Sequence, residues 1–366
     1  MLTSSVEYFF IVLFLVHLTM NARIWYSLLK NKNTSGPANL PVSVIVCARN
    51  EFESLRELIP QLLHQKAVSF ELIVVLDRCT DSSESFLQSI TDPRLKMIVQ
   101  NDLPPNWDGK KYAITQGINL AKHSWVVLTD ADCVPQSENW LSTFQGLMNK
   151  DIELILGASP YKDEKNFLST LIQYETFQTA IHYLSAAINK NAYMGVGRNI
   201  AYTREAFYRA GGFSGFEHVT GGDDDLLVQR ISCKTNTRVN IGTESLTYSF
   251  PKRTWKEYLT QKTRHLSVGK FYRSKFKGEH TFRSFIHAGI WMSFLYLISF
   301  STYPWRIIVP YGLLVLIKGL FFAKIATKTG MPLQISRYPV MDLIYAVFLP
   351  LIAIRALLER NIRWKK

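Results

Sequence analysis

Four mostly apolar stretches lie close to the two ends of the chain. A helix needs about 20 mostly apolar residues to cross a bilayer, so each stretch is a candidate membrane segment. They cover residues 8–20, 285–301, 307–325 and 340–358. The middle of the chain has no such stretch and is long enough to form a sizeable core. The pattern predicts one N-terminal and about three C-terminal transmembrane helices around a soluble domain.

Inside the soluble domain, short β-branched runs alternate with stretches of helical spacing. Runs typical of buried strands cover residues 42–47, 71–76, 96–99 and 125–129. Helical spacing is found at residues 55–65 and 111–121. Strands that alternate with helices predict an α/β fold with a doubly wound, mostly parallel sheet. Such sheets bind ligands beyond the carboxyl ends of their strands, and Asp77 and Asp130 each follow a predicted strand directly.

Residues 166–188 have helical spacing, many aromatic side chains and few charges. This segment fits a core helix and equally a helix on the membrane surface. Together the patterns divide the chain into four units. We expect an N-terminal anchor over 1–30, a soluble domain over 40–250, a basic interfacial region over 251–284 and a C-terminal membrane cluster over 285–366.

The flanks of the first apolar stretch indicate its orientation. Residues 1–7 contain no Lys or Arg, so the stretch lacks the basic start of a signal peptide and is expected to remain as an anchor. Arg23, Lys30 and Lys32 follow it, and the positive-inside rule places that side in the cytoplasm. We therefore expect an integral membrane protein with a cytosolic soluble domain, at the inner membrane if the source is bacterial.

Charge and cysteine content narrow the classes of partner. The formal net charge is +13, and the excess is concentrated at residues 252–283, directly before an apolar stretch. Attraction to anionic lipid headgroups explains this position better than nucleic-acid binding, so we expect no nucleic-acid partner. The four cysteines are widely spaced and form no C-x-x-C pair, which argues against a zinc site and a disulfide framework.

The sharpest chemical motif is T-D-A-D at residues 129–132, directly after an apolar strand. Two carboxylates one residue apart can bind a hard divalent cation, which in turn holds phosphate oxygens. A plain acidic turn is the alternative interpretation of this motif.

Two further residues could bind a nucleotide. Asp77 could accept hydrogen bonds from a base or a ribose, although it could instead cap a helix. Lys110, just before a predicted helix, could reach a diphosphate near the helix start, although such lysines are usually only solvated.

A second acidic motif, G-G-D-D-D, occupies residues 221–225. Three adjacent carboxylates repel one another, which costs stability unless a cation or a function compensates, and a solvated turn is again the alternative. Gln261 and Arg264 follow in a basic helical stretch that carries Trp255 and Tyr258 on its apolar side. Aromatic and basic faces of this kind are typical of a helix at the membrane interface.

In this order and spacing, the motifs resemble those of family 2 glycosyltransferases, which have the GT-A fold. The resemblance covers about residues 41–270. The matching positions are 44–51, Asp77, Gly109-Lys110, Asp130-Ala131-Asp132, Gly211-Gly212-Phe213, Asp223-Asp224, and Gln261 with Arg264. The family includes membrane-bound polysaccharide synthases, and ceramide glucosyltransferases resemble it closely. The active sites of these enzymes face the cytosol.

The resemblance implies a role for each matching carboxylate. Asp77 would contact the nucleotide base. Asp130 and Asp132 would hold a divalent cation, Mg²⁺ or Mn²⁺, with Asp132 as the more direct ligand. Asp224 would be the catalytic base, since it lies six residues before Arg230, the spacing of the family motif.

The resemblance also implies how the donor diphosphate is held. Gln261 and Arg264 match the family's Q-x-x-R-W element, which lies near the donor diphosphate and the acceptor entrance. Lys110 would help to neutralise the diphosphate. His265 stands where the family has Trp, and this departure weakens the inference to the processive polysaccharide synthases.

The implied reaction is an inverting transfer of a sugar from a nucleotide-sugar, expected to be a UDP-sugar. The expected acceptor is a lipid, a lipid-linked glycan or a polysaccharide at the cytoplasmic membrane face. The motifs distinguish neither the sugar nor the acceptor, nor processive from single transfer.

Two other classes of function fit parts of the pattern. A membrane-bound nucleotidyltransferase would need a glycine-rich basic loop after the first strand, where this chain has A-R-N-E at residues 48–51. A noncatalytic membrane scaffold or transporter would favour charges within the apolar stretches. Such charges are few, chiefly Arg306, Lys318 and Asp342.

Overall fold

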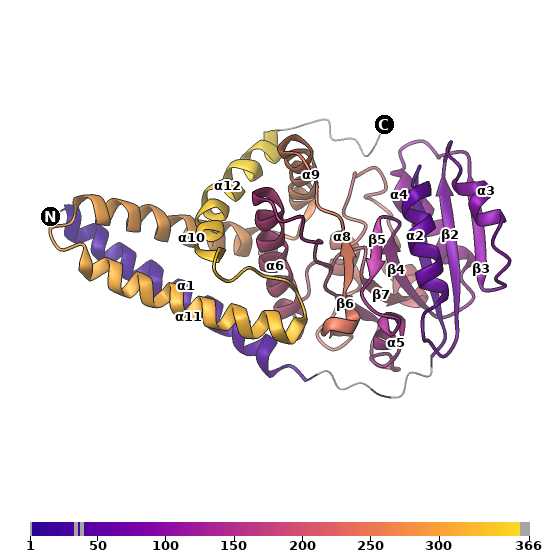
Figure 1. The fold of residues 1–366 in the computed structure, drawn as a ribbon, viewed down its shortest axis with the longest axis horizontal. Helices are drawn as coiled ribbons and strands as arrows, with labels where there is room; N and C mark the ends of the chain where they lie inside the picture. The colour runs from indigo at the N-terminus through magenta and orange to yellow at the C-terminus, as the bar shows by residue number, and fades with distance from the viewer. Residues whose placement is uncertain (1, 33–35, 37–39, 359–366) are drawn as a thin grey trace.

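The structure is a computed structural model that describes residues 2–32, 36 and 40–358. It consists of a layered α/β domain and a long helical projection, at whose tip the first helix begins (Figure 1). Parts of the predicted connection between the anchor and the soluble domain, and residues 359–366 of the predicted membrane cluster, lie outside the described residues.

A seven-stranded sheet forms the centre of the α/β domain, in the order β3-β2-β1-β4-β7-β6-β8. The strands are β1 (Val42–Ala48), β2 (Phe70–Asp77), β3 (Leu95–Gln100), β4 (Trp125–Asp130), β6 (Leu154–Gly157), β7 (Ile200–Thr203) and β8 (Thr237–Asn240). Only β7 runs antiparallel to its neighbours, β4 and β6. The predicted mostly parallel sheet is therefore confirmed. A two-stranded sheet joins β5 (Cys133–Pro135) to β9 (Thr247–Ser249).

Helices cover both faces of the large sheet. On one face, α2 (Phe52–Leu63) and α5 (Trp140–Gln145) bury aliphatic and aromatic side chains against the strands. On the other face lies α4 (Gly109–Leu120), which approaches the sheet closely because Gly117 has no side chain. A Cβ at Gly117 would come within 2.7 Å of the Ile45 side chain. The shorter helices are α3 (Ser83–Gln88), α7 (Arg204–Arg209) and α8 (Asp225–Ile231).

The aromatic-rich segment forms α6 (Phe167–Ile188), and it is a core helix. Residues on most sides of α6 are buried, and the Tyr183 hydroxyl donates a hydrogen bond to the Gly157 carbonyl of β6 at 2.6 Å. On the opposite side, the Ser185 hydroxyl lies 2.9 Å from that of Ser27 in the first helix. The helix thus joins the sheet to the helical projection, and of the two interpretations of this segment the structure shows the first.

The first helix within the predicted basic interfacial region, residues 251–284, is α9 (Trp255–Ser267). Thr254 and Glu257 form a capping box at its start, which satisfies two backbone N–H groups that the helix leaves free. A short 3₁₀ turn, Val268–Phe271, then leads into α10 (Ser274–Phe300).

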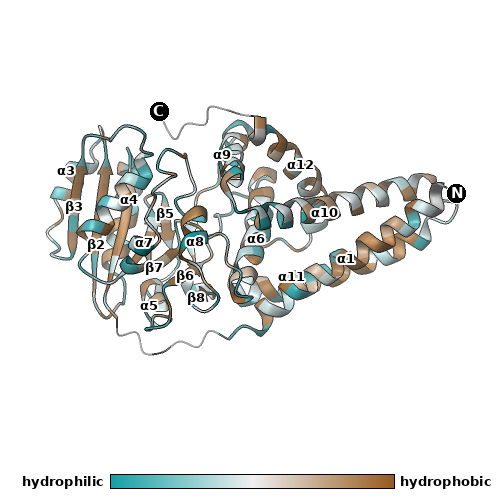
Figure 2. Ribbon diagram, turned by 180° about the vertical axis from the view of Figure 1, so that it is seen from behind, coloured by the Kyte–Doolittle hydropathy of each residue, from teal (hydrophilic) through white to brown (hydrophobic). Residues whose placement is uncertain are grey.

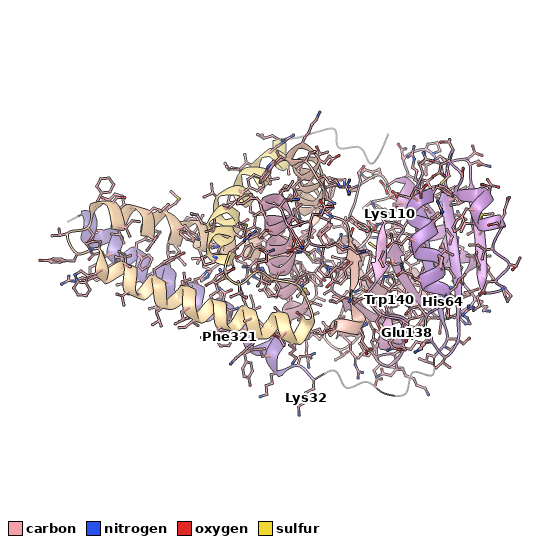
Figure 3. All side chains as sticks on the ribbon, viewed as in Figure 1. Lys32, His64, Lys110, Glu138, Trp140 and Phe321 are labelled. Atoms are coloured by element: carbon pink, nitrogen blue, oxygen red, sulfur yellow. The ribbon has the colours of Figure 1, made fainter. Side chains whose placement is uncertain are left out.

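Long helices form the projection: α1 (Leu2–Lys30), α10 and α11 (Trp305–Thr329), while α12 (Tyr338–Leu358) lies against the α/β domain beside α9 (Figure 1). The end of α1 packs beside α11, where the rings of Trp25 and Phe321 stack at 4.6 Å (Figure 3 labels Phe321). Apolar residues dominate α1 and α11 (Figure 2).

Three of the described helices are long and apolar enough to cross a membrane: Ser5–Lys30, Trp305–Thr329 and Tyr338–Ala356. The prediction of three C-terminal spans is wrong, because α10 does not qualify. Its first turns, S-K-F-K-G-E-H-T-F-R, are polar and basic, so its apolar part is shorter than the about 20 residues that a span needs. It nevertheless packs closely on α1, since a Cβ at Gly289 would lie 2.8 Å from Leu13.

Candidate active site

A cleft of about 850 Å³ opens beyond the carboxyl ends of β1 and β4. Its walls are the turns after these strands, one face of α6, the start of α8 and the side of α9 that faces the sheet. The predicted residues that line it are Lys110, Asp130, Asp132, Asp224, Gln261 and Arg264. Figure 3 shows Lys110 between the sheet and the helices. Motifs more than 100 residues apart in sequence therefore share one site.

Lys110 links the two acidic motifs. Its Nζ lies 2.8 Å from Asp130 Oδ1 and 3.0 Å from Asp223 Oδ2. Burial opposes the charge of Lys110, but the nearby carboxylates outweigh this effect and raise its pKa well above the ordinary value. The predicted diphosphate-binding lysine is thus a permanent cation at the floor of the cleft.

The loop that carries the second acidic motif is fixed by the neighbouring lysine. Lys111 is fully buried, and its Nζ donates hydrogen bonds to the carbonyls of Val219 and Gly221, the latter at 2.6 Å. Gly221 and Gly222 have φ angles of 86° and 75°, which other residues adopt only with strain. The two glycines let the chain turn sharply, so that the carboxylates which follow enter the cleft.

Asp224 is held by backbone groups at the start of α8. Its Oδ2 accepts a hydrogen bond from Gly197 N–H, and its Oδ1 one from Asp225 N–H, both at 2.8 Å. Burial and the neighbouring Asp223 carboxylate raise the pKa of Asp224 to about 6. A carboxylate with this pKa can take a proton near neutral pH, which is the property that a general base needs.

The third aspartate of the motif has a different environment. Asp225 Oδ2 accepts a hydrogen bond of 2.5 Å from the Tyr272 hydroxyl. Burial, followed by repulsion from Asp224, raises the pKa of Asp225 well above the ordinary value. This residue therefore ties the start of α8 to the chain between α9 and α10.

The T-D-A-D motif fits a divalent cation. Asp130, Asp132 and Cys133 offer ligand atoms that lie within 4.8 Å of one another. Carboxylate oxygens suit hard cations such as Mg²⁺ and Mn²⁺, whereas a thiol suits softer metals. Burial raises the pKa of Cys133 well above the ordinary value, so it stays a neutral thiol. The two aspartates are the better ligands.

The Asp132 carboxylate lies near other negative charges, and a bound cation would offset their repulsion. Desolvation by the walls of the cleft, together with the charges of Asp130 and Glu51, raises the pKa of Asp132. Like charges that gather in one place disfavour the ionised form until a cation compensates them.

Asp77 lies at the end of β2 but outside the cleft lining. Its carboxylate accepts hydrogen bonds from Arg78 Nε and Nη2 at 2.8 and 2.9 Å and from Gln100 Nε2 at 2.9 Å. A Cβ at Gly109 would lie only 2.4 Å from Asp77 Oδ2, so the start of α4 closes over it. The carboxylate is therefore fixed next to the helix that bears Lys110.

The position of α9 depends on a buried carboxylate of α6. Glu175 accepts a hydrogen bond from the Tyr258 hydroxyl at 2.5 Å and forms an ion pair of 2.6 Å with Lys262. This anchor turns Gln261 and Arg264 toward the cleft. Arg264 Nε is buried there without a hydrogen-bond partner among the described residues, which suits a site for an anionic ligand.

Arg198 is a site residue that the sequence analysis did not single out. Its guanidinium donates hydrogen bonds to Ser159 Oγ at 2.7 Å, to the Ser159 carbonyl at 2.9 Å and to the Tyr161 hydroxyl at 3.2 Å. Gln261 donates to the same hydroxyl at 3.3 Å. The only sequence signal was its place directly after G-V-G at residues 195–197. Together with Glu175, this group shows that the cleft relies on residues outside the recognised motifs.

The fold and this site define the class of protein. Residues 43–211 match the sequence model of the family described as Glycosyl transferase family 2. This part of the chain is therefore similar to the family 2 glycosyltransferases.

Individual relatives agree with this assignment. The glycosyltransferase GlyG of Streptococcus pneumoniae is 28% identical over 128 residues, which cover 34% of this chain and 41% of GlyG. The succinoglycan biosynthesis protein ExoO of Rhizobium meliloti is 31% identical over 91 residues, 25% of each chain. The matches thus span less than half the length of these curated relatives.

A solved structure shares the fold over nearly the whole chain. The mannosyltransferase PcManGT of Pyrobaculum calidifontis, in complex with GDP-Man and Mn²⁺, aligns with a TM-score of 0.62. The alignment covers 97% of this chain and 100% of that one at 16% sequence identity. At this identity the likeness establishes the GT-A fold of the domain.

Proposed function

We propose that this protein transfers a sugar, with inversion, from a nucleotide-sugar to an acceptor that the membrane delivers. The observation that carries this proposal is the convergence of Asp224 with Asp130 and Asp132 in one cleft. A base poised near neutral pH and a pair of cation ligands are what a direct displacement at a sugar carbon requires. No covalent nucleophile is needed for such a reaction.

Each group in the cleft has a part in the proposed reaction. Asp224 removes the proton from the acceptor hydroxyl as that oxygen attacks the sugar. Lys110 and Arg264 place positive charge where the diphosphate leaves. A divalent cation, Mg²⁺ or Mn²⁺, bound to Asp130 and Asp132 would supply further charge neutralisation at the diphosphate.

Recognition of the nucleotide is proposed to depend on the end of β2. Asp77 is held by Arg78 and Gln100 next to the start of α4, the helix that bears Lys110. We propose that Asp77 meets the base or the ribose of the nucleotide, while Lys110 stays with the diphosphate. A UDP-sugar stays the expected donor, with other nucleotide-sugars as outcomes of the donor screen below.

The acceptor is proposed to come from the membrane. One wall of the cleft is α9, and Arg355 of the candidate span α12 also lines it. The basic side chains Lys30 and Lys328 lie at the ends of α1 and α11, next to the α/β domain. By the positive-inside rule, this arrangement favours a cytosolic catalytic domain at the membrane surface.

A donor screen tests the proposal. Membranes that contain the full chain are incubated with individual nucleotide-sugars and lipid extract, and products are analysed by mass spectrometry. We expect one donor to add the mass of one or more sugars to a lipid or glycan and to release the nucleoside diphosphate. Release of sugar phosphate with attachment of a nucleotide would show a nucleotidyltransferase instead.

The pH dependence of the transfer follows from the environment of Asp224. Burial and Asp223 raise its pKa to about 6, and the base works only when ionised. We therefore expect kcat/KM to be constant above this pKa and to fall about tenfold per pH unit below it. The measurement is a pH profile at saturating cation. An acid limb near the ordinary carboxylate value, about 3.9, would contradict the assignment.

A further inference from the structure

A second cavity, of about 80 Å³, lies among the membrane-side helices. One water needs only about 10–15 Å³ by this kind of measure, so the cavity has room for a small polyatomic group. It is bounded by α1, α6, α10, α11 and α12. The basic and imidazole side chains that line it are His17, His182, His280, Arg283, His287 and Lys318. This composition is unusual for a helical region that carries candidate membrane spans, because buried polar groups are costly there.

The polar residues of α10 form a stripe with helical period. His280, Arg283 and His287 are separated by three and four residues, so they share one face of α10. His17 and Asn21 repeat this spacing on α1. Folding alone does not call for such stripes, since apolar side chains would pack there at lower cost. The stripes meet at the cavity, which indicates a ligand with polar or charged groups.

The charge balance of the cavity favours an anion. Lys318 Nζ lies 2.5 Å from Asp342 Oδ1, and His287 Nε2 lies 3.1 Å from Asp342 Oδ2, so this carboxylate is already matched. Arg283 has no carboxylate within 4.0 Å among the described residues, and it forms no ion pair with Glu279 one turn earlier. Within the described part of the chain, no carboxylate therefore occupies the guanidinium, and its N–H groups are available to an anionic ligand. Arginine with nearby N–H donors is the usual partner of phosphate oxygens.

The cavity lies where the apolar surface of the projection ends. On α1, exposed large apolar side chains run from Tyr8 to Leu15, with the aromatic Tyr26 as a further one near the end of the helix, and on α11 they stop at Leu320. On α10 they begin at Phe282, next to Arg283. In a membrane, this boundary corresponds to the level of the lipid headgroups, and aromatic and long cationic side chains favour that level.

A single helix separates the cavity from the catalytic cleft. Gln178 and His182 of α6 line the cavity, whereas Thr179 and Tyr183 of the same helix line the cleft. The two sites therefore lie on opposite sides of α6, about one helix diameter, roughly 10 Å, apart. A lipid bound at the cavity would hold the domain against the membrane with the cleft beside it.

We propose that this cavity binds the phosphate group of a membrane lipid, with Arg283 as the main ligand and the surrounding imidazoles as additional hydrogen-bond donors. The acyl chains would lie along the exposed apolar sides of α10 and α1. This lipid site is separate from the proposed chemistry in the cleft and does not depend on which sugar is transferred.

Lipid binding to the purified full chain tests the proposal directly. The probe is a short-chain phosphatidic acid added to protein in an uncharged detergent, with native mass spectrometry as the readout. We expect Arg283→Gln to weaken phosphatidic acid binding by at least about tenfold, as for the loss of a charged hydrogen bond. Arg283→Lys keeps the charge and should retain most of the affinity. Arg306→Gln removes the same charge from α11 outside the cavity and should leave binding nearly unchanged.

Two further probes distinguish the source of the phosphate. The matching diacylglycerol, which lacks phosphate, should bind much more weakly than phosphatidic acid, and inorganic phosphate should compete only weakly because it has no acyl chains. Equal binding of diacylglycerol, or an unchanged affinity in Arg283→Gln, would overturn the proposal. Full competition by inorganic phosphate would show a site for free phosphate and overturn the lipid assignment.

A measurement on the unmodified protein covers the case in which Arg283→Gln does not fold. A photoreactive phosphatidic acid is crosslinked to the full chain, and the adducts are mapped by peptide mass spectrometry. We expect adducts within residues 280–287 of α10 or 178–182 of α6. Adducts confined to residues that line neither the cavity nor the exposed apolar sides of α10 and α1 would contradict the site.

Discussion

Replacing Asp224 by Asn should lower sugar transfer by about 10²- to 10⁴-fold, the usual contribution of a general base. Asparagine keeps the shape of the side chain but cannot take a proton near neutral pH. The affinity for the donor should change little, because the base acts on the acceptor hydroxyl and not on the diphosphate. Transfer is measured by product release, and donor affinity by titration with the nucleotide.

The contacts of Asp224 define the control for this prediction. Its carboxylate accepts hydrogen bonds from Gly197 and Asp225 N–H groups, and an amide can accept only one of them well. The free energy of unfolding should therefore fall by about 1–3 kcal/mol, which thermal unfolding will show. Asp225→Asn is the matched variant, since its amide can still accept the hydrogen bond from Tyr272.

The two variants should differ clearly in their rates of sugar transfer. Asp225→Asn removes a carboxylate from the same loop and is expected to retain most of the transfer activity. Near-normal transfer by Asp224→Asn would show that Asp224 is not the base and would leave Asp223 and Asp225 as candidates. Equal losses in both variants would mean that the loop acts through its charge or its fold, without a specific base.

The sheet was largely predictable because its strands are simple in sequence. The runs that form β1, β2 and β4 are almost purely apolar and are bounded by polar turns, and buried parallel strands usually have this pattern. The antiparallel β7 escaped prediction because four residues give no useful period. The extra predicted span failed because the apolar part of α10 is shorter than a span needs and its first turns are polar and basic.

The candidate site was predictable where single motifs carry the chemistry. Asp130, Asp132 and Asp224 do line one cleft, although only the fold brings their motifs together. The supporting contacts were not predictable, because each joins residues far apart in sequence. The ion pair of Glu175 with Lys262, which fixes α9, leaves no local signal in either motif. The roles of Asp77 and Lys110 in donor binding stay predictions.

Removal of divalent cations should abolish transfer, and Mg²⁺ or Mn²⁺ should restore it. The donor diphosphate must approach Asp130 and Asp132, and without a cation these like charges repel it. Asp223 adds further negative charge, and Lys110 already pairs with both Asp130 and Asp223. Lys110 is therefore already paired with carboxylates, and Arg264 alone cannot neutralise a diphosphate, so the donor should bind only weakly in excess chelator.

Asp132→Asn should reproduce this loss at a fixed cation concentration. Loss of even an outer partner of a metal site costs about 10–100-fold in metal affinity, so loss of a direct ligand should cost at least about 100-fold. Donor and cation affinity should fall together, unlike in Asp224→Asn. Calorimetric titration with Mn²⁺, with and without the nucleoside diphosphate, measures both, and Asp151→Asn, an exposed site outside the cleft, is the control. Because desolvation in the cleft and the charges of Asp130 and Glu51 raise the pKa of Asp132, cation binding should also weaken as the pH falls and protons compete for this carboxylate. Full transfer in excess chelator, or unchanged Mn²⁺ affinity in Asp132→Asn, would show that the T-D-A-D motif holds no catalytic cation.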